Sequence, residues 1–207
     1  MYQISAPSED QLAIRDAVAK TIQKFDDDYW LEVDNTGNWP EEFTKAMADG
    51  GWLGVAMPED VGGAGLGLTE ASIVMQTVTR SGAGFSGASA IHLNIFGPKP
   101  LEKFGTPEQR MEHLPKIISG EQKMCFAVTE PNSGLDTSSL ETKAERTDNG
   151  YVISGRKIWT TGAQRADKIL IIARTTPKEQ CDKPYLGLSL FYTDLNRDRI
   201  EAHPIPK

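Results

Sequence analysis

The stretch that decides the fold is Cys125–Gly162, CFAVTEPNSGLDTSSLETKAERTDNGYVISGRKIWTTG. It opens with a short apolar run, Phe126–Val128, that leads into Thr129–Pro131 and then into a polar loop, 132–139. Further along, a second run ends in Trp159–Gly162. Runs of this length, separated by turn residues, are typical of paired strands. We therefore expect two strand ends with a polar loop between them.

These strand ends would offer chemistry that suits a flat, phosphate-bearing ligand. A loop with Gly134 and several hydroxyls exposes successive backbone N–H groups, which form an anion-binding concavity. Thr129 and Thr161 offer hydroxyls to ring heteroatoms, and Trp159 offers a large face for stacking. Together they suit a polar heteroaromatic ring with a phosphate tail, such as a flavin nucleotide. Spacing alone favours a plainer alternative, in which the loop is a solvated turn and Trp159 belongs to the core.

The composition bounds the class of protein. The chain has 207 residues, of which 39% are hydrophobic and 25% charged, as in ordinary soluble globular proteins. This length allows one large domain or two small ones. With 22 Lys and Arg against 29 Asp and Glu, the net charge of -7 is a poor match for nucleic acid. A few backbone N–H groups can still bind one phosphate on an acidic protein.

Targeting signals and disulfides are not expected. Residues 1–30 carry charged side chains and no apolar signal core. No apolar run approaches the roughly 20 residues that a membrane span needs. Cys125 and Cys181 are too few for a disulfide framework. We expect two reduced cysteines in a cytoplasmic protein.

Helical patterns fill the chain up to Gly120. Ser8 and Gln11 have the spacing of a capping box, in which each side chain bonds the other's backbone N–H. Thr106 precedes a proline and an acid, which is a strong helix start. Between these two starts, apolar side chains at helical spacing predict further helices that begin near Pro40, Thr69 and Phe85.

From Met124 onward the segments are short and rich in β-forming residues. Asp148–Gly150 is a tight-turn signal between two of them. The expected strands cover residues 143–147, 151–154, 169–174, 188–193 and 200–205. We therefore predict an α+β multidomain fold. An all-helical domain would span residues 1–121, and an antiparallel, β-barrel-like domain would span residues 122–207.

Three other patterns have a plainer explanation than a catalytic one. Gly62–Gly67 lacks the strand, helix and downstream acid of a dinucleotide fingerprint, so a packed loop is favoured. Glu130 and Asp136 are a possible acid–base pair. The simpler interpretation is that Glu130 ends a strand and Asp136 bonds nearby loop N–H groups. The three histidines share no metal-ligand spacing, so no metal site is predicted.

Four segments resemble the acyl-CoA dehydrogenase family. AVTEPNSGLDTSS at 127–139 and GRKIWTTG at 155–162 resemble its two flavin-contacting signatures. MPEDVGGAG at 57–65 resembles its proline-acid-glycine loop, and FGTPEQ at 104–109 resembles a helix start of the family. The segments fall in the family's order, so the resemblance covers essentially the whole chain. It implies an N-terminal helical domain, a middle β domain and a C-terminal four-helix domain.

The resemblance also implies a cofactor and a reaction. FAD would be the cofactor, and an acyl-CoA thioester would lose its α proton to a carboxylate while the β hydride passes to flavin N5. An electron-transfer protein would then act as the acceptor, within the breakdown of fatty acids or related acyl thioesters. The cofactor-binding residues carried over are Phe126, Ala127, Val128, Thr129, Gly134, Leu135, Trp159, Thr160 and Thr161. Thr129 would bond the pyrimidine edge, the N–H of Leu135 the pyrophosphate, and the Thr161 hydroxyl would lie near N5.

Two features depart from the family's pattern. Leu135 stands where the family usually has Ser, so only its backbone N–H is left for phosphate and its role in substrate binding is weakened. The resemblance also places Lys207 inside the β domain, before the region that holds the family's catalytic carboxylate. No catalytic residue is therefore named, and the 207-residue chain alone is not expected to desaturate acyl-CoA.

Two other functions stay open at this point. One is a flavin oxidase or monooxygenase with the same fold. The other is a non-catalytic module that binds FAD or CoA or serves in assembly. An incomplete β domain would also leave an unpaired strand edge and exposed apolar surface, which need a cover. We therefore expect a homo-oligomer.

Overall fold

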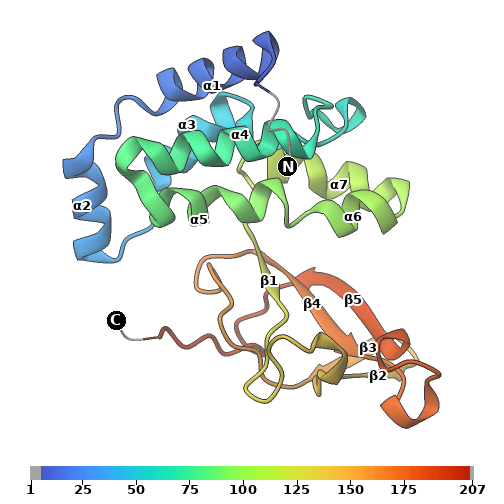
Figure 1. The fold of residues 1–207 in the computed structure, drawn as a ribbon. Coiled ribbons are helices and arrows are strands. Elements are labelled where there is room, and N and C mark those ends of the chain that lie inside the picture. Colours follow the sequence, from blue (N-terminus) through green and yellow to red (C-terminus); the bar gives the residue numbers. More distant parts are fainter. Residues whose placement is uncertain (1–5, 206–207) are drawn as a thin grey trace, which may run out of the picture. The chain divides into compact units, whose positions relative to one another are not determined.

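The computed structural model describes residues 6–205, and the chain divides into two compact units, residues 1–122 and residues 123–207 (Figure 1). The first unit is helical and the second contains a sheet, which confirms the predicted order of helical part and sheet part. Helices α1 to α7 span Glu9–Ile22, Asp27–Thr36, Glu41–Asp49, Leu68–Val78, Gly84–Ile95, Lys99–Phe104 and Pro107–Ile118. Within the described residues, no helix is long and apolar enough to cross a bilayer.

Two helix starts are fixed by the residues that predicted them. At the start of α1, the Ser8 hydroxyl accepts from the Gln11 N–H at 3.2 Å, and the Gln11 side chain accepts from the Ser8 N–H at 3.1 Å. Thr106 and Gln109 make the same reciprocal pair at the start of α7. Each box satisfies two N–H groups that lack a partner inside the helix. Both predicted caps are confirmed.

Apolar packing holds the helical unit together. Helix α4 packs against α1 on one side and α5 on the other, and the π-helical turn Thr79–Ala83 joins α4 to α5 (Figure 1). A cluster of aromatic rings fills the core near α2, with the Trp30 and Phe43 centroids 4.9 Å apart. Burying a side chain of this size stabilises a fold by about 2–3 kcal/mol. The stability of the helical unit therefore comes mainly from the burial of apolar side chains.

The second unit is a five-stranded sheet built around β4. Strands β1 to β5 span Met124–Ala127, Lys143–Thr147, Gly150–Ser154, Lys168–Arg174 and Leu188–Asp194. The β4 sequence, KILIIAR, is a nearly continuous apolar run, which is typical of a strand covered on both faces. It pairs with β1 and β5 and touches β2 at Arg174. The predicted hairpin around Asp148–Gly150 joins β2 to β3.

The prediction of an antiparallel domain was wrong in one respect, because the sheet is mixed. Strand β1 runs parallel to β4, in register from Met124 opposite Lys168 to Ala127 opposite Ile171. Strand β5 runs antiparallel to β4. A parallel pair needs a long connection that returns the chain to the same end of the sheet. The segment 128–167 provides that length and carries the β2–β3 hairpin with it.

Two expected strands are absent from the described residues. The run that ends at Trp159 is irregular from 155 onward, and one backbone bond, Ile158 N–H to Thr129 C=O at 2.9 Å, ties it to the end of β1. The run 200–205 has no ladder partner in the described part of the chain. Its Pro204 also has no N–H to donate. The apolar residues of both runs give the pattern of a strand. In the described chain, however, neither run has a neighbouring strand with which to form a ladder.

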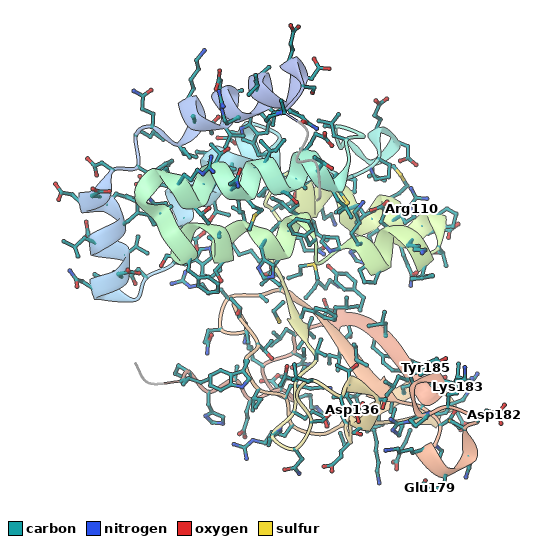
Figure 2. The ribbon with its side chains drawn as sticks, viewed as in Figure 1. Arg110, Asp136, Glu179, Asp182, Lys183 and Tyr185 are labelled. Atoms are coloured by element: carbon teal, nitrogen blue, oxygen red, sulfur yellow. The ribbon has the colours of Figure 1, made fainter. Side chains whose placement is uncertain are left out.

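The core of the sheet unit lies on one face of β1 and β4, where Cys125 faces Ile169 and Ala127 faces Ile171. Burial raises the pKa of the Cys125 thiol to about 12. A thiol with such a pKa stays protonated and unreactive at neutral pH. The connection from β4 to β5 is polar, as expected, and Glu179, Asp182, Lys183 and Tyr185 project from it (Figure 2).

Candidate functional site

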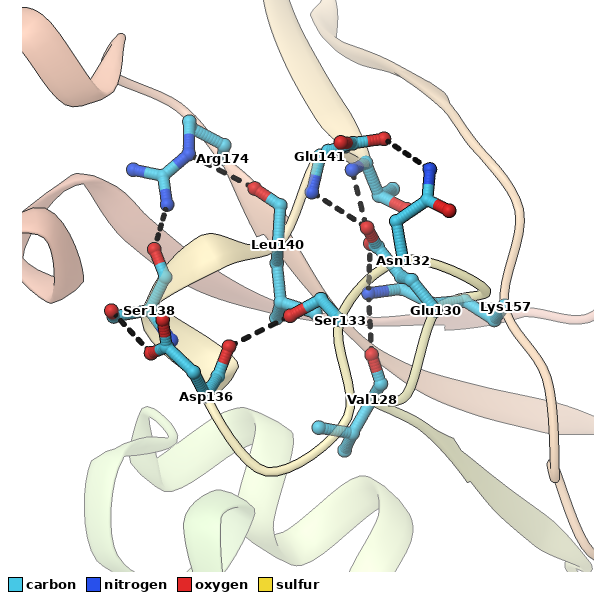
Figure 3. Close-up of polar contacts among 11 residues, drawn as sticks. Val128, Glu130, Asn132, Ser133, Asp136, Ser138, Leu140, Glu141, Lys157 and Arg174 are labelled. Atoms are coloured by element: carbon cyan, nitrogen blue, oxygen red, sulfur yellow. Dashed lines mark hydrogen bonds and ion pairs between the residues drawn. The ribbon is translucent and has the colours of Figure 1, made fainter.

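The candidate site lies in the sheet unit, where the chain leaves β1. Glu130 and Ser133 exchange backbone hydrogen bonds at 3.0 and 3.2 Å, which closes a tight turn. The Ser133 hydroxyl then donates to the Asp136 carbonyl at 2.7 Å (Figure 3). These bonds fold residues 130–136 into a tight turn. We call residues 130–140 the open loop, because several of its backbone N–H groups have no acceptor among the described residues, as described below.

Asp136 holds the second half of the open loop. Its carboxylate accepts from the Ser138 N–H at 3.0 Å and from the hydroxyls of Ser138 and Ser139. These donors hold the pKa of Asp136 below its usual range. The arrangement agrees with the simpler interpretation of the sequence, in which Asp136 shapes the loop and takes no part in proton transfer.

Arg174, at the end of β4, holds the loop from the sheet side. Its guanidinium donates to the carbonyls of Ser138 at 2.7 Å and Leu140 at 3.1 Å (Figure 3). It also donates to the Pro184 carbonyl at 3.0 Å. This role of Arg174 was not predicted from the sequence. The first two partners lie 36 and 34 residues away in the chain, so no local pattern signals the contact.

Glu130 and Lys157 form a buried ion pair at the base of the loop. Their side chains are 4% and 10% exposed, and Lys157 Nζ lies 2.8 Å from Glu130 Oε1. The same ammonium donates to the Val128 carbonyl at 2.9 Å. The carboxylate also accepts from the N–H groups of Glu141 at 2.6 Å and Thr142 at 3.0 Å. Both charges are therefore compensated by several hydrogen bonds (Figure 3).

This environment decides what Glu130 can do. Burial by itself raises the pKa of Glu130, but the Lys157 ammonium, Thr142 and the two N–H groups outweigh it and hold that pKa below its ordinary value. A carboxylate that stays ionised and already accepts several hydrogen bonds is a poor proton acceptor. Glu130 and Asp136 are thus both engaged in holding the loop.

The tip of the open loop leaves three successive N–H groups without an acceptor. Among the hydrogen bonds of residues 6–205, none uses the N–H of Gly134, Leu135 or Asp136. A Cβ added at Gly134 would have no atom within 4 Å, and the Leu135 side chain is fully exposed. Consecutive free N–H groups at an open surface make an anion-binding concavity.

The second segment of the site, residues 155–162, presents an exposed indole. Trp159 has φ of 59°, the one positive φ of a non-glycine residue in the described chain. A bulky side chain adopts this conformation only when its surroundings impose it. The indole is 67% exposed, so the alternative that placed Trp159 in the core was wrong. Gly155 fixes the start of the segment, because a Cβ there would lie 2.3 Å from the Thr142 hydroxyl.

The structure brings these two segments together but distributes the nine predicted residues unevenly. Phe126 and Ala127 belong to β1, and the Ala127 side chain is buried in the sheet core. Val128 and Thr129 follow directly and adjoin the second segment through the Thr129–Ile158 bond. The remaining predicted residues lie in the open loop and the second segment: Gly134, Leu135, Trp159, Thr160 and Thr161.

The groups left without partners suit a flavin nucleotide. In the described part of the chain, the hydroxyls of Thr129 and Thr161 have no hydrogen-bond partner. Trp159 adds an exposed aromatic face beside them. The amides at the tip of the loop add donors for a phosphate. A flavin nucleotide needs hydroxyls for its polar ring, a face for stacking and amides for its phosphate. The sheet unit contains all three.

Both units match domains of one class of flavoenzyme. Residues 8–121 match the acyl-CoA dehydrogenase N-terminal domain, and residues 125–207 match the acyl-CoA dehydrogenase middle domain. The chain belongs to the acyl-CoA dehydrogenase family. The predicted resemblance to this family is thereby confirmed.

Individual relatives agree with this assignment. The mitochondrial isovaleryl-CoA dehydrogenase of Pongo abelii is 34% identical over 174 residues, which cover 83% of this chain and 41% of that protein. The crystal structure of an acyl-CoA dehydrogenase from Geobacillus kaustophilus superposes with a TM-score of 0.80 at 26% identity, over 91% of this chain and 48% of that one. The chain spans half or less of the length of the curated relatives it matches.

The cofactor prediction is also confirmed at the level of the family. FAD is the cofactor expected for acyl-CoA dehydrogenases, and the FAD complex of PigA has the same fold, with a TM-score of 0.82 over 92% of this chain and 49% of that one. At 23% identity this neighbour shows the fold alone. The donors left open in this chain are consistent with that cofactor.

Proposed function

We propose that this chain supplies the FAD-binding part of an acyl-CoA dehydrogenase that desaturates an acyl-CoA thioester between its α and β carbons. The observation that carries the proposal is the open loop, whose three unused N–H groups lie in the middle domain of a flavoenzyme family. FAD, when bound, supplies the acceptor for the hydride. The residues of this chain bind and orient it.

Each part of the site has one task in this proposal. The N–H groups of Gly134 and Leu135 bind the pyrophosphate, as anion-binding amides do. Thr129 and Thr161 donate to ring heteroatoms, where added electron density is stabilised by fixed donors. Trp159 covers the ring with its exposed face. Phe126, Ala127, Val128 and Thr160 line the same ring with backbone and apolar atoms, as the family's signatures imply.

The base that removes the α proton is not among the carboxylates of the open loop. Glu130 is held by Lys157 and two N–H groups, and Asp136 is held by two serines. We expect no desaturation of acyl-CoA by the 207-residue chain alone. An assay with an artificial electron acceptor tests this, and measurable turnover would show that the chain does contain a base.

The substrate, electron acceptor, pathway and oligomeric state are also part of the proposal, and the family suggests each of them. The substrate is an acyl-CoA, with the exposed Leu135 side chain offering it an apolar contact. The electron acceptor is an electron-transfer protein, the pathway is fatty-acid or related acyl breakdown, and the working form is a homo-oligomer. A cytoplasmic location remains our prediction from the sequence. The isovaleryl-CoA dehydrogenase of Pongo abelii, one of the relatives, is mitochondrial.

A titration of the 207-residue chain with FAD tests the binding claim. We expect a saturable complex, monitored by quenching of flavin fluorescence. T129V and T161V should each weaken binding about tenfold, because a lost hydrogen bond to a buried ring atom costs about 1.4 kcal/mol. T147V is the matched control, since Thr147 is an exposed residue of β2. No FAD binding, or equal binding by all four proteins, would overturn the proposal.

A further inference from the structure

The end of β1 and the segment that leads to Trp159 are tied together at three successive residues. The Val128 carbonyl accepts from Lys157 Nζ, the Thr129 carbonyl from the Ile158 N–H, and the Glu130 carboxylate from Lys157 Nζ. Two of these three ties come from a single ammonium group. Figure 3 shows the contacts of Lys157 with Val128 and Glu130. Thr129 lies between these two partners in the sequence, and Trp159 directly follows Ile158.

The ammonium group is costly to place there. Lys157 is 10% exposed and Glu130 is 4% exposed, so both charges are largely removed from water. Replacing such a pair by apolar residues is often neutral or favourable for stability, so stability alone is weak grounds for keeping it. A buried pair of this kind gives directional contacts that apolar packing does not give. The side chains of the two neighbours it locates, the Thr129 hydroxyl and the Trp159 indole, have no hydrogen-bond partner in the described chain.

The backbone conformation of Trp159 requires neighbouring groups that hold the segment in place. Its φ of 59° is unfavourable for a side chain with a Cβ and persists only where neighbours impose it. Among the described residues, the segment has one backbone bond to the chain that leaves β1, from the Ile158 N–H to the Thr129 carbonyl. Without the ammonium of Lys157, that single bond would be left to hold the segment against β1.

The geometry points to the Glu130–Lys157 pair as the positioning device of the flavin site, which sets the Thr129 hydroxyl and the Trp159 indole at a fixed separation. The inference rests on the proposed function and goes beyond it, because neither residue is assigned a contact with FAD. Lys157 is a positioning residue that acts through Ile158 and Trp159. Glu130 holds the ammonium in place and is not a proton acceptor.

The test compares K157M, K157R and E130Q with K168M as a matched control. Lys168 is a lysine of the sheet unit with a 19% exposed side chain, and it pairs with Asp194 at 2.6 Å. It lies in β4 opposite Met124, outside the two segments of the site. For each folded variant, FAD affinity and the shape of the bound flavin's visible absorption band are measured. Hydrogen exchange of the Ile158 N–H without FAD is the third readout.

The expected result is specific to the pair. K157M should weaken FAD binding at least tenfold, alter the flavin band and speed exchange of the Ile158 N–H, whereas K168M should change none of these. K157R, which keeps the charge, should recover most of the affinity. E130Q, which keeps an acceptor for the backbone N–H groups, should fall between wild type and K157M.

Two results would overturn the inference while leaving FAD binding intact. One is a K157M protein that binds FAD with wild-type affinity and spectrum. The other is that K157M, K157R and E130Q all fail to fold while K168M folds, because the pair would then serve the stability of the unit. Wild-type protein that binds no FAD would instead overturn the proposed function, and the exchange of Ile158 would still report whether Lys157 holds the segment.

Discussion

Two glycine-rich loops in this chain use their backbone N–H groups in opposite ways. In the loop 57–66 of the helical unit, most of the backbone N–H groups donate to a backbone carbonyl. Gly63 donates to Pro58 at 2.9 Å and Gly65 to Met57 at 2.8 Å. The next N–H groups reach back to the turn before the loop, from Ala64 to Gly54 and from Leu66 to Val55. This loop, which we call the closed loop, is held by its own backbone.

The open loop of the sheet unit is held by side chains instead. Asp136 and Ser133 bond within it, and Arg174 bonds to it from β4. The N–H groups of residues 134–136 are left unused in the described chain. The difference teaches that glycine content alone does not predict an anion-binding loop, and that amides without acceptors are the feature on which our proposal for the open loop depends. It also supports the choice of a packed loop over a dinucleotide fingerprint for Gly62–Gly67.

The largest expected effect breaks the closed loop. In G63A the new Cβ would lie 2.2 Å from the Met57 carbonyl oxygen, so the backbone must move. We expect the free energy of unfolding of the helical unit to fall by about 3 kcal/mol, as for severe overpacking. Urea denaturation followed by far-UV circular dichroism measures it. G134A is the matched control, since a Cβ there meets nothing within 4 Å, and equal losses in both would contradict the comparison.

The next effect loosens the open loop from outside. R174M leaves the carbonyls of Ser138, Leu140 and Pro184 without their donor. We expect a loss of about 2 kcal/mol in the sheet unit, typical of hydrogen bonds from a charged donor, together with weaker FAD binding. R146M, at an exposed position of β2, is the control. Unchanged FAD affinity in a destabilised R174M would show that the loop keeps its shape without the arginine.

A smaller effect of opposite sign concerns the second segment. W159G removes the Cβ that makes φ of 59° unfavourable, and the lost indole is mostly exposed. We expect the sheet unit to gain about 1 kcal/mol in stability while FAD affinity falls. W159N, which tolerates this backbone region, should keep wild-type stability. A destabilised W159G would mean that the indole packs against the unit.

The smallest effect separates the two loops by pH. The pKa of Asp136 lies below its usual range because Ser138 and Ser139 donate to it, so its contribution is complete above the unfolded value, about 3.9. This contribution of Asp136 to stability is lost as the pH falls through the pKa of the folded state, which is the lower of the two. The protection of the Ser138 amide, measured as its exchange rate relative to the intrinsic rate at the same pH, should therefore fall in acid, whereas the protection of the Gly63 amide should not, since its carbonyl partner does not titrate. D136N should remove the dependence, and a persistent one would point to another group.

Local features of the fold were predictable, because their partners are close in the sequence. The boxes at Ser8 and Thr106 join residues three positions apart. The hairpin at Asp148–Gly150 joins neighbouring strands. Pairing between distant segments was not predictable in the same way. The apolar run of β1 says nothing of whether its partner, β4, runs parallel or antiparallel.

The candidate site shows the same division. The signature residues Thr129, Gly134 and Thr161 could be found in the sequence because the family's motif names them. Lys157 and Arg174 could not, because their roles depend on carbonyls and a carboxylate that folding brings from 27 to 36 residues away. The strand expected up to Trp159 was wrong for a related reason, since periodicity does not reveal a left-handed backbone.

The exposed indole has one more consequence. The sequence holds four tryptophans, and Trp30, Trp39 and Trp52 all belong to the helical unit. Trp159 therefore stands by itself in the sheet unit and faces water, where an indole emits at longer wavelength than in an apolar core. The red edge of the intrinsic emission is a label-free optical reporter that the protein carries at the very place where a ligand would arrive.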